Sequence, residues 1–434
     1  MARLRIGSGG LFFALLAGPL VVLGGIVACE TDNGDTTHGP DIGTLPDAGG
    51  RRKLPDGAIV EADGAPVQGD DDDDDDDDDT GPGACTTGLT AVLAGNDTTL
   101  SGAVRTGDGA WTGGAIAGGA AKSKPALVAF GAGFLAATRG ADDKLQSLTA
   151  SGTAWSAPAV IGLGLVKGPP SLTVAGTRAH LVYTSDSFFK HGIYEGTSWN
   201  AADAPVGTGT GAGEFSFGTF SGGLAAVGSE VVFAENGGDN GLYARTYGSA
   251  WSAAVPVFGA GTVGSTGATP EIAPISAGKS DLVIVYAYKK ETPASQNAIA
   301  FATRQPAETE QEKKWGNAET QYVSGVLTAE KFFLTAISAT SVILTFRGDD
   351  GNAYYTQGSA NGDAVEWTSP AAIGGAPTAV DTAPAVAKGA CGDDAVFAYA
   401  TASAVSTVSL KAGAWSTPSA VTGTTGTHVA IATK

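Results

Sequence analysis

The chain of 434 residues carries 25 basic and 44 acidic side chains, which gives a formal net charge of −19 at pH 7. A protein this acidic, with no stripe of clustered Lys and Arg, lacks the surface that binds phosphate backbones, so we expect no nucleic-acid partner. A chain of this length can contain more than one structural region, and its acidic residues are not spread evenly along it.

The first 28 residues have the pattern of a secretory signal. Arg3 and Arg5 precede residues 11–28, a run without charged side chains that ends in small residues. A basic start, an apolar core and a small-residue end predict a signal peptide over residues 1–28. An uncleaved membrane anchor is the alternative, because the run is close to the shortest length that crosses a bilayer. Pro19 within the run favours a processed signal.

The four residues Ile26-Val27-Ala28-Cys29 resemble the bacterial lipobox, in which a small residue precedes the cysteine that becomes the lipidated N-terminus. The resemblance implies lipidation of Cys29 and attachment to a membrane, with about 0.8 kcal/mol from each buried methylene of the lipid. It also implies outward sorting, because Glu30 is not the aspartate that often retains lipoproteins at the inner membrane. We therefore expect a lipid-anchored protein of the cell envelope, at the outer membrane or the cell surface.

Residues 29–83 contain few large apolar side chains and many Asp, Gly, Pro and Thr. Residues 30–83 hold 18 acidic and three basic side chains, and ten of the acids form the run Asp70 to Asp79. Such a segment cannot bury enough apolar surface to offset chain entropy and its charges repel, so we predict a disordered acidic tether. Calcium binding by the Asp run is the alternative, although calcium needs about six to eight oxygens in a defined loop.

Residues 84–434, the predicted head, keep a net charge of only −6 once the tether and the two basic residues of the signal are counted. They are rich in Gly, Ala, Thr and Val, with short apolar runs between turn residues, which predicts an all-β domain. Tryptophan recurs at spacings of 44 to 64 residues, and a repeat of about 40–50 residues with short strands is typical of a propeller. We interpret these tryptophans as blade packing: Trp111, Trp155, Trp199, Trp251, Trp315, Trp367 and Trp415.

One repeat can be divided in full. Its predicted strands, from the inner to the outer, are residues 124–130, 133–140, 144–152 and 154–161. Four short strands per repeat match one propeller blade.

The two ends of the head complete one blade. Residues 88–111 align with residues 133–155, so they supply second, third and fourth strands, while the final segment THVAIATK reads as an inner strand. We therefore predict a seven-bladed β-propeller closed by N- and C-terminal strands, which leaves no exposed sheet edge at the seam. Six blades is the alternative if the long repeat at residues 251–315 is misread.

Cys85 and Cys391 each precede a predicted second strand, in adjacent blades. A secreted protein meets an oxidising compartment, where two cysteines usually pair. We predict a Cys85–Cys391 disulfide, which requires Cα atoms within about 7 Å of each other. Two buried free thiols are the alternative.

The sequence contains no HExxH, GxSxG or paired CxxC motif. Glycosidases use two carboxylates about 5–10 Å apart, and Glu230, Glu235, Asp142 and Asp239 are the candidates for such a pair. We expect a binding protein rather than an enzyme, with no catalytic residue, metal or cofactor. A sialidase-like glycoside hydrolase is kept as an alternative. His180, on a predicted strand, is interpreted as structural.

Several repeats share a phrase after the second strand, as in TRGADDKLQ (138–146), ENGGDNGLY (235–243) and FRGDDGNAYY (346–355). With the tryptophan that follows, the phrase resembles that of bacterial seven-bladed propeller lectins and their sialidase-like relatives; the second phrase also resembles kelch propellers. The lectin resemblance implies sugar sites between blades, built from aromatic and polar residues. The residues that it marks are Arg139, Asp142, Asp239, Arg347, Asp349 and Tyr354.

A second candidate surface is the segment SDSFFKHG, which we predict as a loop after a second strand. It brings together Phe188, Phe189 and His191, and exposed apolar groups often mark contacts. These side chains are candidate ligand residues, with capping of the core as the alternative. We expect a lipid-anchored carbohydrate-binding propeller. A non-catalytic scaffold for envelope proteins is the alternative that a single aromatic patch at this segment would favour.

Overall fold

The computed structural model describes two short segments, Arg52–Lys53 and Ile59–Val60, and most of residues 85–434. Within that head, the described residues exclude 186–187, 207–221, 237–240, 259–268, 290–296, 309–313, 328–331 and 403. The chain divides into two units, Met1–Thr80 and Gly81–Lys434. No helix in the described part of the chain is long and apolar enough to cross a membrane.

In the first unit, β1 (Arg52–Lys53) pairs antiparallel with β2 (Ile59–Val60). The predicted signal peptide, the lipidation site Cys29 and the rest of the predicted tether lie outside the described residues.

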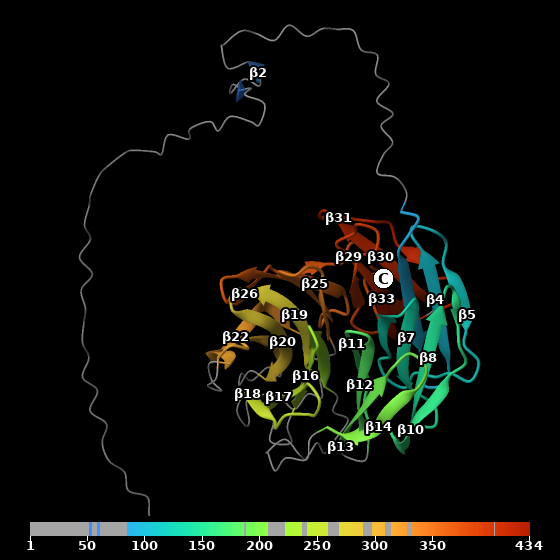
Figure 1. Cartoon of the computed structure of the whole chain (residues 1–434). Coiled ribbons are helices and arrows are strands. Elements are labelled where there is room, and N and C mark those ends of the chain that lie inside the picture. The colour runs from blue at the N-terminus through green and yellow to red at the C-terminus, as the bar shows by residue number, and fades with distance from the viewer. Residues whose placement is uncertain are drawn as a thin grey trace, which may run out of the picture. The chain divides into compact units, whose positions relative to one another are not determined.

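The second unit is all-β, and its seven antiparallel sheets follow one another around a ring as propeller blades (Figure 1). Each blade is built on four strands, which run in order from the innermost to the outermost. Blade 1 is β6 (Ala126–Phe130), β7 (Gly133–Arg139), β8 (Lys144–Ser151) and β10 (Ala159–Leu165). Blade 2 is β11 (Ser171–Ala175), β12 (Arg178–Ser185), β13 (Phe188–Tyr194) and β14 (Trp199–Pro205). Blade 3 is β15 (Gly223–Val227), β16 (Glu230–Asn236), β17 (Leu242–Tyr247) and β18 (Val255–Phe258).

The remaining blades have the same plan. Blade 4 is β19 (Glu271–Ala277), β20 (Ser280–Lys289), β21 (Asn297–Arg304) and β22 (Trp315–Leu327). Blade 5 is β23 (Phe332–Ala336), β24 (Ser341–Arg347), β25 (Ala353–Asn361) and β26 (Ala364–Trp367). Blade 6 is β28 (Ala385–Lys388), β29 (Ala395–Thr401), β30 (Ala404–Lys411) and β31 (Ala414–Trp415). Blade 7 is β33 (His428–Thr433), β3 (Leu89–Gly95), β4 (Leu100–Thr106) and β5 (Thr112–Ala115). The predicted seven-bladed all-β propeller is confirmed.

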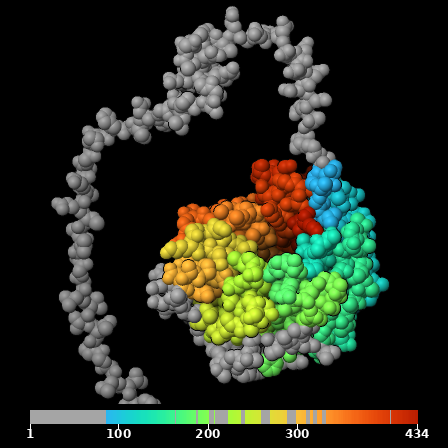
Figure 2. Space-filling view, in the orientation of Figure 1, coloured from blue at the N-terminus to red at the C-terminus, as the bar shows by residue number. Residues whose placement is uncertain are grey.

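Blade 7 is assembled from both ends of the head, as predicted. Its inner strand β33 pairs antiparallel with β3, from Thr90 opposite Thr433 to Gly95 opposite His428. In Figure 2 the blue start of the head lies against its red end, which closes the ring. The closing strand gives blade 7 the inner strand that the N-terminal segment does not supply.

The predicted outer strand at residues 154–161 is in fact two pieces, β9 (Ala154–Trp155) and β10, and both pair with β8. Pro158 lies between the pieces. Proline has no N–H to give to the ladder, so the strand breaks there and resumes. Blades 5 and 6 repeat the break, with β27 (Ala371–Ala372) and β32 (Ser419–Ala420) each following a proline.

The tryptophans pack each blade onto the one before it. Trp199 Nε1 donates to Ser147 Oγ on β8 of blade 1 at 3.0 Å. Ring contacts of 5.1 to 5.7 Å between centroids join three further tryptophans to the third strand of the preceding blade: Trp251 with His191, Trp367 with Phe301, and Trp415 with Tyr355. The repeat of tryptophan is therefore a repeat of the contact between blades.

At three junctions between blades, two consecutive linker residues donate backbone hydrogen bonds to the two blades on either side; we call this pair of bonds a backbone clasp. At the junction of blades 1 and 2, Val166 N donates to Asp143 O at 2.7 Å and Lys167 N donates to Thr184 O at 3.0 Å. The pair Val380 and Asp381 makes the equivalent bonds between blades 5 and 6, and Ala121 and Lys122 make them between blades 7 and 1. Each of these three linkers is thereby fixed to the second-to-third-strand turn of the blade behind and to the second strand of the blade ahead.

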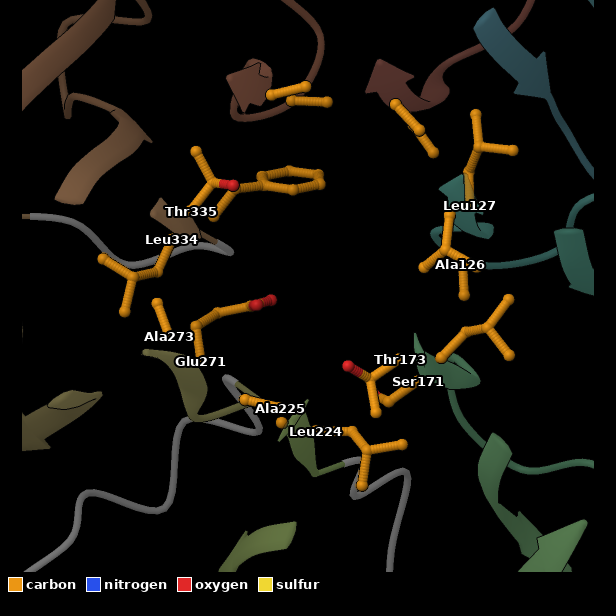
Figure 3. A pocket seen from close by; sticks show the side chains of 18 of the residues that line it. Ala126, Leu127, Ser171, Thr173, Leu224, Ala225, Glu271, Ala273, Leu334 and Thr335 are labelled. Carbon is orange, nitrogen blue, oxygen red and sulfur yellow. The ribbon is translucent and has the colours of Figure 1, made fainter. Parts of the chain in front are cut away.

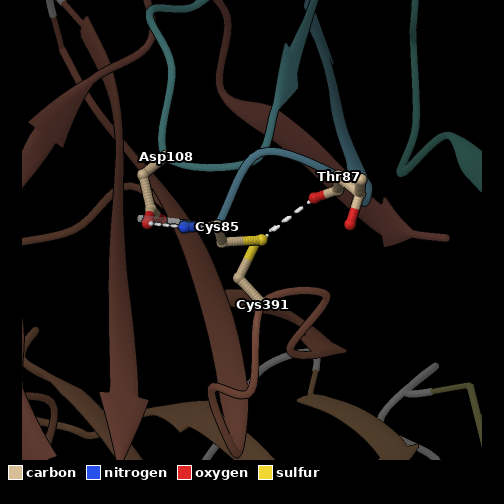
Figure 4. The surroundings of a disulfide bond; sticks show 4 residues. All are labelled: Cys85, Thr87, Asp108 and Cys391. Atoms are coloured by element: carbon tan, nitrogen blue, oxygen red, sulfur yellow. Dashed lines mark hydrogen bonds between the residues drawn. A yellow bond between two sulfur atoms is a disulfide. The ribbon is translucent and has the colours of Figure 1, made fainter. Parts of the chain in front are cut away.

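A disulfide joins Cys85, just before β3, to Cys391 in blade 6, with the Cα atoms 5.5 Å apart (Figure 4). This is the pairing predicted from the sequence, and the separation is within the required limit. Asp108 Oδ2 accepts a hydrogen bond from Cys85 N at 3.1 Å, and Asp108 N donates to Cys85 O at 3.0 Å. The start of blade 7 is therefore tied both to its own strands and to the neighbouring blade.

We expect the Cys85→Ala/Cys391→Ala double variant to unfold with a free energy about 2–5 kcal/mol below that of the parent protein, because the bond closes a long loop in the unfolded chain. Urea denaturation with and without dithiothreitol measures this. The reductant should destabilise the parent protein and leave the double variant unchanged; equal responses of the two proteins would contradict the assignment.

Candidate functional site

The turn between β24 and β25, residues 347–354, gathers polar groups around one aromatic ring; we call it the blade 5 turn. Tyr354 Oη donates to Asp350 Oδ2 at 2.7 Å, and Asn352 N donates to Asp350 Oδ1 at 3.0 Å. Arg347 Nε donates to Val380 O, in the linker to blade 6, at 2.8 Å. A guanidinium, a carboxylate and a phenol are thus held on one short turn.

The Tyr354 ring lies over the turn because Gly348 leaves room for it. A Cβ atom on Gly348 would come within 2.8 Å of the Tyr354 ring, which a real side chain would not tolerate. The ring also stacks on Phe346, with centroids 5.6 Å apart and planes 16° from parallel. The glycine and the phenylalanine therefore set the orientation of the phenol.

Hydrogen bonds fix the charge state of this turn. The backbone N–H of Asn352, and then the Tyr354 hydroxyl, lower the pKa of Asp350 from its ordinary value. In return the Asp350 carboxylate raises the pKa of Tyr354. At neutral pH the turn therefore presents an ionised carboxylate beside a protonated phenol.

The turn between β7 and β8, residues 139–146, is the same structure in blade 1; we call it the blade 1 turn. Asp142 Oδ1 accepts from Lys144 N at 3.2 Å, as Asp350 accepts from Asn352 N. Gln146 takes the place of Tyr354, since a Cβ on Gly140 would lie 2.8 Å from its amide. The blade 1 turn therefore has the polar frame of the blade 5 turn without its aromatic ring.

Asp143 distinguishes the blade 1 turn. It adopts φ of 63°, where the blade 5 turn has Gly351 at 81°. A non-glycine residue is uncommon in this region, and in this turn the Asp143 carboxylate bonds to Lys122 Nζ at 3.1 Å and to Arg139 Nε at 2.8 Å. The Lys122 and Arg139 hydrogen bonds lower the pKa of Asp143.

The predicted arginines are accordingly junction residues as well as candidate ligand residues. Arg139 Nη1 donates to Lys167 O at 3.2 Å in the linker to blade 2, and Arg347 Nε donates to Val380 O in the linker to blade 6. The structure brings Arg347 and Tyr354 together, and it places Arg139 and Asp142 in the other turn, on another blade. Asp349 is exposed in the turn, while its neighbour Asp350 makes the contacts to Tyr354.

Sequence reasoning missed Asp350, Gln146 and Asp143. The phrases at 138–146 and 346–355 hold two adjacent acids each, so the letters alone do not show which acid accepts the hydrogen bond from the backbone of the turn. Aligning the two phrases on Arg139 and Arg347 would have paired Asp142 with Asp350.

The prediction of a loop carrying Phe188, Phe189 and His191 is wrong, because all three belong to strand β13. Phe188 exposes 54% of its surface, whereas Phe189 is buried against Phe233 with ring centroids 4.8 Å apart. His191 is buried as well. The segment alternates between exposed and buried side chains with the period of a strand, so it forms no single aromatic patch.

His191 instead pairs with His180, the histidine predicted to be structural. Their ring nitrogens Nε2 and Nδ1 lie 3.1 Å apart, and Tyr247 and Trp251 of blade 3 pack on the His191 ring. Burial, and then the neighbouring His180, lower the pKa of His191 from 6.5 to about 4. Burial also lowers the pKa of His180.

Three of the four carboxylates considered for a glycosidase lie in the described part of the chain, and each of these three is bound to a cation. Glu230 pairs with Arg304, Asp142 with Lys144 at 3.2 Å, and Glu235 with Arg245 at 2.9 Å. Asp239 lies outside the described residues. Among the described residues, no three or more His, Cys, Asp or Glu side chains form a group that could hold a metal ion.

The fold is similar to that of solved lectins. BP39L lectin from Burkholderia pseudomallei has a TM-score of 0.59 at 14% identity, over 78% of this chain and 96% of the lectin. SapL1 lectin, solved with α-methyl fucoside, scores 0.46 at 13% identity over 69% of this chain and 95% of its own. The six-bladed Aleuria aurantia lectin scores 0.43 at 15% identity over 64% and 89% of the two chains. No family model and no curated protein matches the sequence. The likeness to BP39L shows that the head has the fold of a β-propeller.

We expect the stability of the head to depend on pH through His191. Because its pKa is about 4 when folded and 6.5 otherwise, the unfolded chain binds the extra proton first as the pH falls. The free energy of unfolding should therefore drop by about 3 kcal/mol between pH 6.5 and pH 4 from this residue. Glu235, whose pKa burial raises to about 6, contributes with the opposite sign over part of this range.

The His191→Gln variant separates the two contributions. Urea unfolding of both proteins across this pH range should show the stability advantage of the parent protein shrinking toward acid. Parallel curves for parent and variant would show that His191 does not titrate between the two states.

Proposed function

We propose that the head binds carbohydrate and that the blade 5 turn is a sugar site. The observation that carries the proposal is the juxtaposition of the Tyr354 ring, the Asp350 carboxylate and Arg347 on one turn at the junction of two blades. No second function has an observation of this kind in its favour, since the aromatic patch needed by a scaffold is divided between the surface and the core.

The chemistry of the blade 5 turn suits a sugar. A sugar hydroxyl both donates and accepts hydrogen bonds, so it can donate to the Asp350 carboxylate and accept from the Arg347 guanidinium. The C–H face of a pyranose ring is apolar and packs on an aromatic face, which Tyr354 supplies at low cost in side-chain entropy. The hydrogen bonds within the turn already hold these side chains in place, so binding a sugar costs little further side-chain entropy.

The blade 1 turn supplies a second, weaker site. It keeps Arg139 and Asp142 but has Gln146 where the blade 5 turn has its aromatic ring. Two sites on one ring raise the avidity for a surface that carries many glycans. The likeness of the fold to the BP39L lectin supports a carbohydrate ligand.

We further propose that the head is carried on the cell envelope by lipid on Cys29, with residues 30–83 as an acidic spacer. The spacer would let the head reach glycans beyond the anchoring membrane, because a charged, apolar-poor segment stays extended. A head that binds sugar and an anchor at the membrane together define an envelope lectin.

A glycan-array screen of the whole secreted protein tests the sugar site. We expect Tyr354→Ala and Arg347→Ala each to weaken binding of the preferred glycan by about tenfold or more, since each removes one hydrogen-bonding or stacking contact. Tyr354→Phe should fall between the parent and Tyr354→Ala. Phe188→Ala, which removes an exposed aromatic ring in blade 2, is the matched control and should bind as the parent does.

Circular dichroism and thermal unfolding of each variant establish that it is folded. A blank array with folded parent protein would overturn the carbohydrate proposal. Loss of binding in Phe188→Ala but not in Tyr354→Ala would move the site to blade 2.

The anchor is tested separately. Cells expressing the full chain with a radiolabelled or clickable fatty acid should label the parent protein, and Cys29→Ser should abolish the label and release the head from the membrane fraction. Labelling that persists in Cys29→Ser would contradict lipidation at this cysteine.

A further inference from the structure

The channel on the axis of the ring holds a cavity of about 500 Å³, lined by all seven inner strands (Figure 3). Most of its wall is small or aliphatic, as with Leu127, Leu224 and Leu334. Glu271, at the start of β19, extends its carboxylate into this cavity. This carboxylate is mostly buried, and burying a carboxylate is costly unless a cation accompanies it.

In this structure the cation comes from the chain itself. Lys124, which precedes β6 of blade 1, places its Nζ 2.6 Å from Glu271 Oε1 of blade 4. The same Nζ lies 3.5 Å from the centre of the Phe333 ring of blade 5. The lysine therefore reaches from blade 1 to non-neighbouring blades on the far side of the ring, and its ammonium is held between a carboxylate and an aromatic face.

These contacts define the kind of group that fits this part of the channel. A carboxylate at hydrogen-bond distance and a ring face beneath the cation are the two elements that bind organic ammonium groups in proteins. Glu271 exposes only 17% of its side chain, so its charge is screened little by water. The aliphatic side chains that line the cavity can contact the carbon chain of a ligand, and the cavity is larger than one lysine side chain fills.

Burial raises the pKa of Glu271 in spite of the Lys124 partner. A cation that lies closer to this carboxylate than Lys124 does, or that excludes more water, would therefore stabilise its ionised form further. Lys124 is attached by a long flexible chain and exposes 21% of its side chain, so it can leave toward solvent.

We propose that the channel is a binding site for small organic ammonium ions, with Glu271 as the counter-ion and Phe333 as the aromatic face, and that Lys124 occupies the site when no ligand is bound. The ligand class is a primary or quaternary ammonium with a short apolar body. This site lies apart from the sugar site of the blade 5 turn and goes beyond the proposed carbohydrate function.

Isothermal titration calorimetry of the whole protein with n-butylammonium chloride tests the site, with n-butanol and sodium chloride as uncharged and inorganic controls. We expect saturable binding of n-butylammonium alone. Glu271→Gln should abolish it, and Lys124→Ala should strengthen it by about tenfold or more, because the tethered competitor is gone. Glycan binding should be unchanged in Glu271→Gln.

Thermal unfolding gives a second measurement. Lys124→Ala leaves Glu271 without a partner and should unfold at a lower temperature, and n-butylammonium, but not n-butanol, should restore part of the loss. The matched control is Lys122→Ala, which removes the Lys122–Asp143 ion pair of 3.1 Å outside the channel and should not be rescued.

The double variant Lys124→Met/Glu271→Gln removes both charges and keeps the result interpretable if a single variant fails to fold. It should fold and bind no ammonium. Absence of saturable binding to the parent protein, or binding that persists in the double variant, would overturn the proposal and leave the Lys124–Glu271 pair as a strut across the channel.

Discussion

The structure of the head depends on one strand pairing, that of β33 with β3. A blade of this propeller is buried on both faces, so it is stable only when a neighbour covers each face. The second strands show this directly, since β7 and β29 are buried along nearly their whole length. An open row of blades would leave the first and last sheets uncovered and their edges unpaired. Pairing the last strand of the chain with the first strand of the head turns the row into a ring, and the Cys85–Cys391 bond ties the same seam on the side of blade 6.

Closure of the ring places two different kinds of surface. The inner strands converge on a channel, while the turns after the second strands lie against the linkers that lead to the next blade. The tryptophan contacts and the backbone clasps recur from blade to blade, so the frame stays constant while single positions vary. The phenol of Tyr354, the amide of Gln146 and the histidine pair are such single departures. The candidate functional groups of this protein are therefore side chains that particular blades carry on this shared frame.

The ion pairs with buried side chains are also features of particular blades. Glu235 with Arg245 and Glu271 with Lys124 are ion pairs of mostly buried side chains, and the buried Arg304 pairs with the partly exposed Asp281 and Glu230. A buried ion pair gives little net stability, because desolvation offsets the attraction between the charges. The pairs in blades 3 and 4 therefore distinguish those blades without strengthening them much. The Lys124–Glu271 pair bears this desolvation cost inside a cavity, where a bound cation could take the place of Lys124 beside the carboxylate.

The sequence by itself determined the fold class, the number of blades and the closing strand, because tryptophan spacing and strand-length apolar runs are local signals that the ring only repeats. It also determined the cysteine pair, since both cysteines occupy the same place in adjacent repeats. The prediction from the sequence treated the outer strand of blade 1 as continuous and overlooked the break at its proline. It also placed Phe188, Phe189 and His191 in a loop, because this segment does not alternate clearly between polar and apolar residues. Only the tertiary structure decided which of two adjacent acids faces Tyr354, and that Lys124 meets Glu271 across the channel. The first contact depends on the backbone path of one turn, which an alignment of the two phrases suggests but does not fix. The second joins residues of different blades that lie 147 positions apart, and no local pattern in the sequence predicts it.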